Sequence, residues 1–439
     1  MKHFLGILTI LVSFACSTQA QTTEPCAYDE YIKELNKAYP GFMEQLDAQY
    51  MEAIAHINNP KLNKREDDTI YRIPVVFQVV YNVNAENLDD SLIHSQMEVL
   101  NECFRRRNAD TTDTRDIFKP VAADTRIEFY LATEDPQGQP TNGIVRTETN
   151  LTTFYSGVTT LSLDAVKNKS LGGADPWDTD KYLNIWVCDL SFRNIPIILG
   201  YAYPPTNAAN WNQDSYVGKN RQGVVLHYGV VGVGNPYDAG QNSTGARTAV
   251  HEVGHFLGLR HIWGDGRQGQ NGCLLDDFID DTPITYSRNN SCSKSKNTCS
   301  NETPDLPDQI ENYMDYTPGT CVNMFTKKQA ALMLYNLRNL RSTLPEEIAP
   351  EPEIFPATRN VVYPVPVADN MTIELVGVDP TKEYQIQISN MLGQLIHEKP
   401  YKLDVEKTEI EMSFLASGVY FFEIWDGEQL LFSQKLLKY

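Results

Sequence analysis

Apolar and polar positions follow two different periods along the first three quarters of the chain. Residues 71–81 form a long apolar, β-branched run, which predicts a central strand. Residues 91–107 place apolar side chains at helical spacing, which predicts a helix that backs the sheet. Similar runs predict strands at 126–132, 182–189 and 223–231, and helices at 248–257 and 325–344. Together these elements predict an α+β domain with a twisted, mixed sheet above a cleft.

The end of the chain has a different pattern, with a period of two. Proline and glutamate crowd between Pro345 and Pro356, which predicts a solvated linker over residues 346–360. After it, apolar and polar residues alternate in short segments at 371–375, 383–389, 410–412, 419–425 and 430–436. This alternation predicts a small antiparallel β-sandwich at residues 361–439.

The start of the chain is typical of a secretory signal peptide. Met1–Ala20 carries Lys2, then an apolar stretch, then the small-residue cleavage signal Thr18-Gln19-Ala20. We expect cleavage before Gln21, and a lipid anchor on Cys16 is the alternative. No later segment is apolar enough to cross a bilayer, so we expect an exported, soluble protein.

Charge narrows the classes of partner. The 439 residues carry a formal net charge of −20, which argues against nucleic acid and anionic membrane surfaces as partners. An Asp-rich run at residues 276–281 offers oxygen ligands of the kind that Ca²⁺ prefers.

The most specific chemistry lies between His251 and His261. His251 and His255 are four residues apart, so on a helix they project from one face, where they can bind one Zn²⁺. Glu252 is then placed to act as general base on a zinc-bound water. Gly258 permits the left-handed turn that ends the helix and returns His261 as the third ligand. Three protein ligands leave one position open, which is typical of a catalytic zinc site.

This run resembles the zinc-binding motif of the metzincin metallopeptidases. Residues 312–316, with Met314 at their centre, are similar to the tight methionine turn of that group. Residues 264–265, 276–283 and 323–326 narrow the resemblance to the pappalysin family. It covers about residues 70–345, and we expect a catalytic domain at 69–345.

The resemblance implies further roles for single residues. Met314 is expected to form a hydrophobic floor under the metal, and Tyr316 to donate a hydrogen bond to the tetrahedral intermediate. Asp277 and Thr282 match calcium-binding positions of the family. Asp280 and Asp281 are expected as additional calcium ligands.

Cysteine usage fits an oxidising compartment. Removal of Cys16 with the signal peptide leaves seven cysteines, an odd number. Four of them lie between the zinc motif and the end of the methionine turn, and sequence alone allows three pairings for these four. The pappalysin resemblance implies the pairs Cys273–Cys299 and Cys292–Cys321. Cys103 and Cys188 are expected to be buried free thiols.

Cys26 lies in the segment that we expect to be a propeptide, residues 21–68. It precedes a helical, charged stretch at 28–57. A thiolate at Cys26 could take the open zinc position and keep the enzyme latent, as in some propeptides of the family. The alternative is a disordered or mispaired cysteine.

Gly319 marks a departure from the family. Pappalysins that cut before Arg or Lys carry an aspartate at this position, at the base of the pocket for the residue after the scissile bond. Without that carboxylate a basic preference loses its clearest cause, so we expect a broader or different preference.

The C-terminal segment resembles the sorting domain of the type IX secretion system, in residues 363–366, 390–394, 418–420 and 435–438. Val365 departs from the motif, which usually has Asn there. The resemblance implies that the secretion machinery is a partner and that the protein is secreted or held at the cell surface. The competing interpretation is a carbohydrate-binding sandwich.

Three functional classes remain. The first is an exported zinc metalloendopeptidase made as a zymogen, with proteins or peptides as substrates. The second is a catalytically impaired relative that acts as a surface or binding protein. The third is another zinc hydrolase on the same metal frame, which the methionine turn disfavours.

Overall fold

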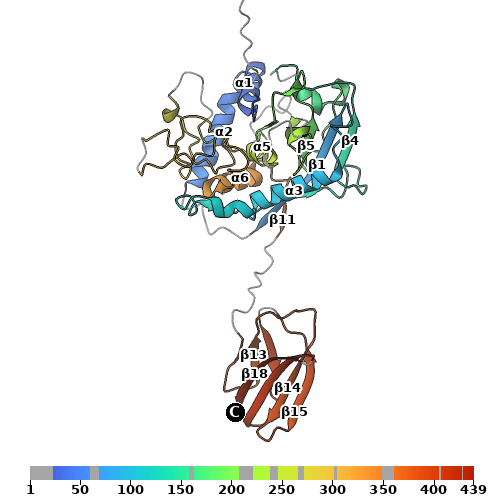
Figure 1. Cartoon of the computed structure of the whole chain (residues 1–439), viewed down its shortest axis with the longest axis vertical. Helices are drawn as coiled ribbons and strands as arrows, with labels where there is room; N and C mark the ends of the chain where they lie inside the picture. Colours follow the sequence, from blue (N-terminus) through green and yellow to red (C-terminus); the bar gives the residue numbers. More distant parts are fainter. Residues whose placement is uncertain are drawn as a thin grey trace, which may run out of the picture. The chain divides into compact units, whose positions relative to one another are not determined.

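The computed structural model describes residues 23–59, 69–157, 163–206, 221–237, 246–264, 271–300, 304–348, 360–404, 407–427 and 429–439. The chain divides into two compact units, Met1–Ala349 and Pro350–Tyr439 (Figure 1). The expected signal peptide lies outside the described residues, as do residues 349–359 of the expected linker. Among the described residues, no helix combines the length and the apolar character needed to cross a bilayer.

The first unit is built on one mixed sheet. Its central strand is β1 (Ile70–Tyr81), which is buried at nearly every position because both faces are covered. One edge of β1 pairs in parallel with β3 (Ile127–Leu131) and then with β4 (Ile144–Glu148). The other edge pairs with β11 (Glu346–Ile348), antiparallel, and with β5 (Leu183–Cys188), parallel. Beyond β5 follow β9 (Val224–His227), parallel, and β8 (Gly200–Ala202), antiparallel, at the sheet edge. The predicted α+β fold with a mixed sheet is confirmed.

Two helices pack on this sheet, and a third lies in the same unit. Helix α3 (Asp90–Phe104) begins at Asp89, whose side chain accepts from Ser91 N at 2.8 Å. It packs against β3 and against α5 (Thr248–Phe256). Helix α6 (Lys327–Asn339) begins with a capping box formed by Thr326 and Gln329.

Short elements complete the first unit. The additional strands are β2 (Ala122–Ala123), β6 (Ser191–Phe192), β7 (Ile195–Pro196) and β10 (Phe325–Thr326). The 3₁₀ turns are η1 (Ala109–Asp113), η2 (Asp164–Lys167), η3 (Lys169–Leu171), η5 (Tyr228–Val230) and η6 (Gly272–Leu274).

Residues 23–59, called the N-terminal segment below, contain α1 (Tyr28–Ala38) and α2 (Phe42–Ile57), drawn in blue in Figure 1. The predicted helical stretch is interrupted at Pro40-Gly41, where Gly41 has φ of 95°. The segment contributes to both hydrophobic cores of the first unit. Side chains of α2 join the core beneath the sheet, while residues between Cys26 and Leu46 join a second core on its other face. The segment is therefore packed into the first unit.

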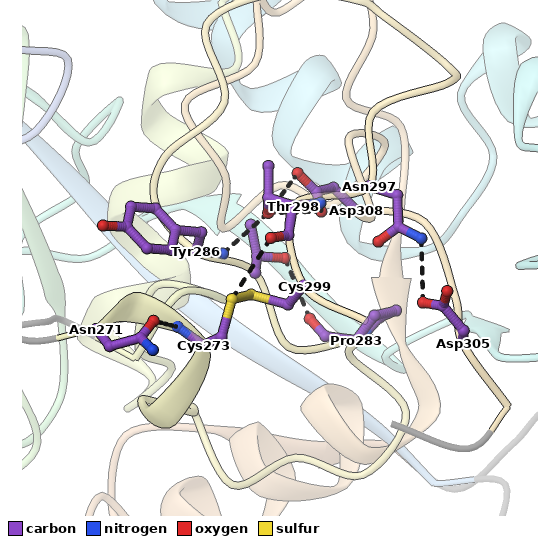
Figure 2. Close-up of a disulfide and its surroundings, with 10 residues drawn as sticks. Asn271, Cys273, Pro283, Tyr286, Asn297, Thr298, Cys299, Asp305 and Asp308 are labelled. Atoms are coloured by element: carbon purple, nitrogen blue, oxygen red, sulfur yellow. Dashed lines mark hydrogen bonds between the residues drawn. A yellow bond between two sulfur atoms is a disulfide. The ribbon is translucent and has the colours of Figure 1, made fainter. Parts of the chain in front are cut away.

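Two disulfides cross-link the irregular region after α5. They join Cys273 to Cys299 and Cys292 to Cys321, with Cα–Cα distances of 5.5 and 5.9 Å. These are the pairs that the family resemblance implies. Figure 2 shows the first of them beside a local network in which the Thr298 hydroxyl donates to Asp308 and accepts from Tyr286 N at 3.0 Å. A region with little regular structure thus gains its order from covalent and polar links.

The remaining described cysteines of this unit are free and buried, and they are Cys26, Cys103 and Cys188. Burial raises the pKa of the Cys103 thiol to about 11 and that of Cys188 well above its ordinary value. The latter two thiols therefore behave as packing groups, as expected.

The second unit is an all-β sandwich with a core of its own. One antiparallel sheet has the order β12-β13-β16 and the other β15-β14-β17-β18. The strands are β12 (Val361–Tyr363), β13 (Asn370–Glu374), β14 (Tyr384–Asn390), β15 (Leu395–Tyr401), β16 (Thr408–Glu411), β17 (Gly418–Asp426) and β18 (Gln429–Lys438). The inward positions alternate along each strand, with Ile386, Ile388 and Phe422 fully buried. The predicted antiparallel sandwich is confirmed.

Some expected boundaries differ from the structure. Residues 346–348, expected to begin the linker, form β11 and pair with β1, because the edge of β1 beside Ile70–Arg72 offers unpaired backbone groups. The strand expected over 223–231 ends at His227 and turns into η5. The strands β4, β8 and β15 were not expected, since they are short or lack regular alternation.

Candidate active site

Helix α5 presents the first two histidines. His251 and His255 lie one turn apart, and both are buried, as is Glu252 between them. The helix needs Gly254 on its far side, because a Cβ there would lie 2.5 Å from Met314 Sδ. The methionine turn therefore packs directly on the backbone of the helix that carries the histidines.

Gly258 ends the helix and redirects the chain. It has φ of 96°, and its N–H donates to His255 O at 2.8 Å while Leu259 N donates to Gly254 O at 2.9 Å. This is the Schellman arrangement, in which glycine avoids the cost of a left-handed backbone. A Cβ at this position would also lie 2.1 Å from Asn336 Nδ2, which donates to Leu257 O. The turn brings His261 back to the first two histidines.

The three imidazoles converge through their Nε2 atoms. His255 Nε2 lies 3.1 Å from the Nε2 atoms of both His251 and His261, and the latter two are 3.3 Å apart. His251 Nδ1 donates to Tyr313 O at 2.7 Å and His255 Nδ1 to Leu259 O at 2.8 Å. These bonds place the proton on Nδ1 and leave the Nε2 lone pairs facing one another.

This geometry fits a zinc ion. Burial lowers the pKa of His251 to about 3 and that of His255 well below its ordinary value, so both are neutral. Facing lone pairs at hydrogen-bond distance repel unless a cation lies between them. Zn–N bonds of about 2.0–2.1 Å in a tetrahedron separate two nitrogens by about 3.3 Å, which matches the observed spacing.

Glu252 lies beside this group in a fully buried position. Its Oε2 accepts from the Cys26 thiol at 3.5 Å, while Oε1 accepts no hydrogen bond from the described residues. Burial raises the pKa of this carboxyl to about 8. The site has room for the side chain because residue 200 is glycine, where a Cβ would lie 2.8 Å from Glu252 Cγ.

Met314 and Tyr316 lie beside the helix that carries the first two histidines. Met314 is fully buried under α5. The ring of Tyr316 lies 5.0 Å from that of His261 and 5.6 Å from that of His251, measured between centroids. Its hydroxyl donates to Cys26 O at 2.9 Å. The phenol is thus within reach of a peptide group held at the histidines.

The N-terminal segment contacts the site at several points. Cys26 Sγ and the nitrogens of the three histidines lie within 4.8 Å of one another. The ring of Tyr28 stacks on His255 with centroids 4.0 Å apart and an interplanar angle of 3°. Asp29 Oδ1 lies 3.3 Å from His261 Nδ1. A short stretch of this segment therefore covers the histidines.

A cavity of about 290 Å³ opens beside His251, and its lining includes Pro25, Thr248 and Gly319. Arg247 also lines it and holds a bidentate pair with Asp110, at 2.7 and 2.9 Å. The same guanidinium donates to Gly319 O at 2.7 Å. Arg247, paired with Asp110, therefore lies against Gly319 in the lining of the cavity.

The acidic loop, residues 276–281, packs against Gly264, where a Cβ would lie 2.5 Å from Asp276 N. Asp277 is fully buried, and its Oδ1 accepts from Thr282 Oγ1 at 2.7 Å while Oδ2 has no hydrogen-bond partner among the described residues. Asp280 pairs with Lys328 Nζ, and Asp281 Oδ2 accepts from Lys328 N at 3.0 Å. In the described part of the chain these carboxylates do not converge as the histidines do.

Several residues of the site were not expected from the sequence. They are Tyr28, Asp29, Asp110, Gly200 and Arg247. Arg247 directly precedes α5, but nothing in its neighbourhood identifies Asp110 as its partner 137 residues away. Tyr28 and Asp29 are close to Cys26 in the chain, and this proximity is the signal that could have found them.

The arrangement of mixed sheet, histidine helix, glycine turn and methionine floor is that of the metzincin metallopeptidases. A family model described as "Pregnancy-associated plasma protein-A" matches residues 166–338. A second model, described as "Secretion system C-terminal sorting domain", matches residues 361–438.

Solved structures of a relative agree with the first of these models. Mature mirolysin from Tannerella forsythia, in complex with a cleaved peptide, is 40% identical, covers 63% of this chain and 95% of its own, and has a TM-score of 0.54. A mutant of promirolysin from the same organism is 36% identical, covers 73% of this chain and 96% of its own, and has a TM-score of 0.60.

A curated relative is the extracellular metalloprotease 1 of Coccidioides posadasii, which is 38% identical over 146 residues, 33% of this chain and 46% of that protein. The chain thus spans less than half the length of the first curated relatives that it matches. The full-length similarity to mirolysin nevertheless defines the family. The chain belongs to the pappalysin family of metzincins and carries a C-terminal sorting domain of the type IX secretion system.

Proposed function

We propose that this protein is a secreted zinc metalloendopeptidase that is made as a latent zymogen. One observation carries the proposal: three buried imidazoles converge beside a buried glutamate whose Oε1 accepts no hydrogen bond from the described residues. That combination suits a metal and a water molecule to be deprotonated. The bound, cleaved peptide of mature mirolysin supports the same class of substrate.

A zinc ion held by His251, His255 and His261 would polarise the scissile carbonyl and lower the pKa of a water molecule. Glu252 accepts the proton of that water and passes it to the leaving amine. Tyr316 donates its hydroxyl hydrogen to the oxygen on which charge develops. In the zymogen that hydroxyl is engaged by Cys26 O.

The direct test is cleavage of casein or gelatin by the processed, zinc-loaded protein. Glu252→Ala should lower kcat by about 10²–10⁴-fold, since it removes the general base. A chelator should abolish activity and added Zn²⁺ should restore it. Absence of cleavage by a folded, zinc-loaded protein would instead favour the catalytically impaired binding protein.

Latency is attributed to the N-terminal segment and to Cys26 within it. The thiol lies with the three imidazoles, where it can take the open zinc position. The greater coverage of this chain by promirolysin, 73% against 63% for the mature form, supports a propeptide role for the segment. Cys26→Ala should make the intact zymogen cleave a small peptide. A variant as inactive as the parent would exclude the thiol switch.

The cavity beside His251 is proposed as the pocket for the residue after the scissile bond. Arg247 in its lining and the absence of a carboxylate at Gly319 disfavour a basic side chain there. A peptide-library profile dominated by Arg at this position would refute the proposal.

Calcium binding is proposed for the acidic loop, with Asp277, Thr282, Asp280 and Asp281 as ligands. The partnerless Oδ2 of Asp277 is the feature that supports it. The Lys328 side chain already pairs with Asp280, and its backbone N–H donates to Asp281. Asp277 is therefore the residue to test. Thermal unfolding should shift upward with Ca²⁺ in the parent and not in Asp277→Asn.

Export is proposed to proceed through the signal peptide and then the type IX machinery, with the sorting domain as its recognition element. Removing residues 360–439 should leave the protein inside the cell envelope. Fractionation of medium, surface and periplasm measures this outcome.

A further inference from the structure

An aromatic enclosure around a buried lysine lies next to the active site. Lys167 Nζ is 5.3–5.7 Å from the centroids of four rings, and its side chain is 1% exposed. It donates to Arg221 O at 2.8 Å and lies 3.3 Å from Asp164 Oδ1. We call this group the Lys167 cage, and its members are Lys167, Asp164, Tyr31, Trp186, Tyr201 and Tyr203.

One wall of the cage comes from the N-terminal segment. Tyr31, on α1, is fully buried, and its hydroxyl donates to Asp164 Oδ1 at 2.7 Å. Its ring lies 5.3 Å from that of Tyr201 and 6.1 Å from that of Tyr203. The other members belong to residues 164–203 of the catalytic unit. Loss of the segment would therefore expose two ring faces and take a donor from a carboxylate.

The cage lies on one side of the histidines. Pro25 lines the cavity that contains Gly319, Cys26 lies at the histidines, and Tyr28 stacks on His255. Tyr31 follows Tyr28 in the chain, whereas Pro25, which lines the Gly319 cavity, precedes it. If that cavity takes the residue after the scissile bond, the cage faces residues before the bond.

The distance along a peptide can be estimated from chain geometry. From Cys26 to Tyr28 the chain turns at Ala27, which has φ of −105° and ψ of 19°, and from Tyr28 to Tyr31 it is helical, so the segment covers at most about 10 Å. An extended substrate covers that distance in about three residues. Tyr201 lies on β8, the edge strand, which can pair with such a peptide.

We propose that, in the processed enzyme, the Lys167 cage is a substrate subsite that binds a tyrosine side chain three or four residues before the scissile bond. The proposal rests on the proposed peptidase function. The substrate ring lies against Tyr201 and Tyr203 beside the ammonium group of Lys167, and its hydroxyl donates to Asp164. In the zymogen Tyr31 fills the same place, so the segment blocks this subsite as well as the histidines.

The test varies the peptide, so that no variant of the protein can fail to fold. The full chain is activated by limited proteolysis and given peptides that differ only in Tyr, Phe or Ala at each of the second to fifth positions before the scissile bond. At the third or fourth position, Tyr should exceed Phe in kcat/KM by about 5–10-fold, the net worth of one typical hydrogen bond. Ala should be lower still, by about another 10-fold. Equal rates for Tyr, Phe and Ala at both positions would overturn the subsite.

A matched variant assigns the preference to the cage. In Asp164→Ala the ratio of Tyr to Phe should fall to about one, while the ratio of Phe to Ala persists because the rings remain. The ratio is internal to each protein, so it is insensitive to the fraction folded. An unchanged ratio of Tyr to Phe would place the preference elsewhere.

A binding measurement separates failure of the subsite from failure of the peptidase function. This measurement uses the variant Glu252→Ala, processed by the same limited proteolysis that activates the parent. The processed variant is titrated with a synthetic peptide of residues 23–38. The change Tyr31→Phe in this peptide should weaken binding about 5–10-fold, whereas the exposed Lys37→Ala should not. If no substrate is cleaved but this difference is found, the cage stands and the peptidase function falls. If Tyr31→Phe has no effect, the cage falls.

Discussion

The two ends of the described chain are attached in opposite ways. The N-terminal segment has no core of its own, and its apolar side chains complete two cores of the catalytic unit. The C-terminal unit closes a separate core between its two sheets. Both are expected to be temporary parts of the protein, yet only one is built into the enzyme.

The difference follows from what each part has to do. A segment that keeps an enzyme inactive must reach its catalytic groups, and residues 26–31 contact the histidines, Glu252 and Tyr316. A sorting domain has to be recognised whatever cargo it is attached to, which favours independent folding. We expect the two parts to respond differently to the same kind of perturbation.

The largest contrast should come from truncating one buried aromatic side chain in each part. Tyr31→Ala should lower the free energy of unfolding of the catalytic unit by about 3–5 kcal/mol, because it opens a cavity in a shared core. Phe422→Ala should cost the C-terminal unit a similar amount. Calorimetry of the full chain should show each variant shifting one transition. If Phe422→Ala shifted both transitions equally, the C-terminal unit would not fold independently of the catalytic unit.

Loss of a disulfide should distinguish the two units by a slightly smaller change in the free energy of unfolding. All eight cysteines precede residue 349, so a reductant can act only on the first unit. Replacing both Cys292 and Cys321 with Ala should lower the stability of that unit by about 3 kcal/mol through the longer unconstrained loop. The C-terminal transition serves as the internal control, and a shift of that transition would contradict independent folding.

A buried carboxyl of the catalytic unit predicts a pH effect. Burial raises the pKa of Asp315 to about 6, above its value in the unfolded chain. The folded state then holds a proton that the unfolded state releases, so this group's stabilisation is complete below about pH 4 and is lost as the pH rises to about 6. The loss should be about 3 kcal/mol. Denaturant titrations at several pH values give the free energy of unfolding as a function of pH. Between about pH 4 and pH 6 this free energy should fall less steeply in Asp315→Asn than in the parent. Identical slopes in the two proteins would refute the raised pKa of Asp315.

The smallest effects should come from exposed ion pairs, and here the two parts should agree. Asp47 of α2 pairs with Arg260 at 2.6 Å, and Asp426 pairs with Lys382 at 3.4 Å in the C-terminal unit. Asp47→Asn and Asp426→Asn should each cost less than about 1 kcal/mol, because water screens exposed pairs. A cost for Asp47→Asn close to that of Tyr31→Ala would show that polar contacts, rather than core packing, hold the N-terminal segment.

Much of the zinc site is local in the sequence and could therefore be predicted. The spacing of His251, His255 and Gly258 determines which side chains share a helix face and where the helix ends. The same holds for the alternation in the C-terminal strands. By contrast, the short strands β8 and β11 could not be predicted, since their pairing depends on the exposed edges of β9 and β1.

What the sequence determined by itself is the ligand set and its chemistry, because helical periodicity and a glycine turn act over a few residues. Only the tertiary structure decided what surrounds it. It placed Asp110 against Arg247, Met314 under Gly254, and Tyr31 over Lys167. These partners are far apart in the chain, and the packing of the two cores brings them together. The physical reason is that hydrophobic burial is non-directional, so the sequence pattern marks which side chains are buried but not which of them meet.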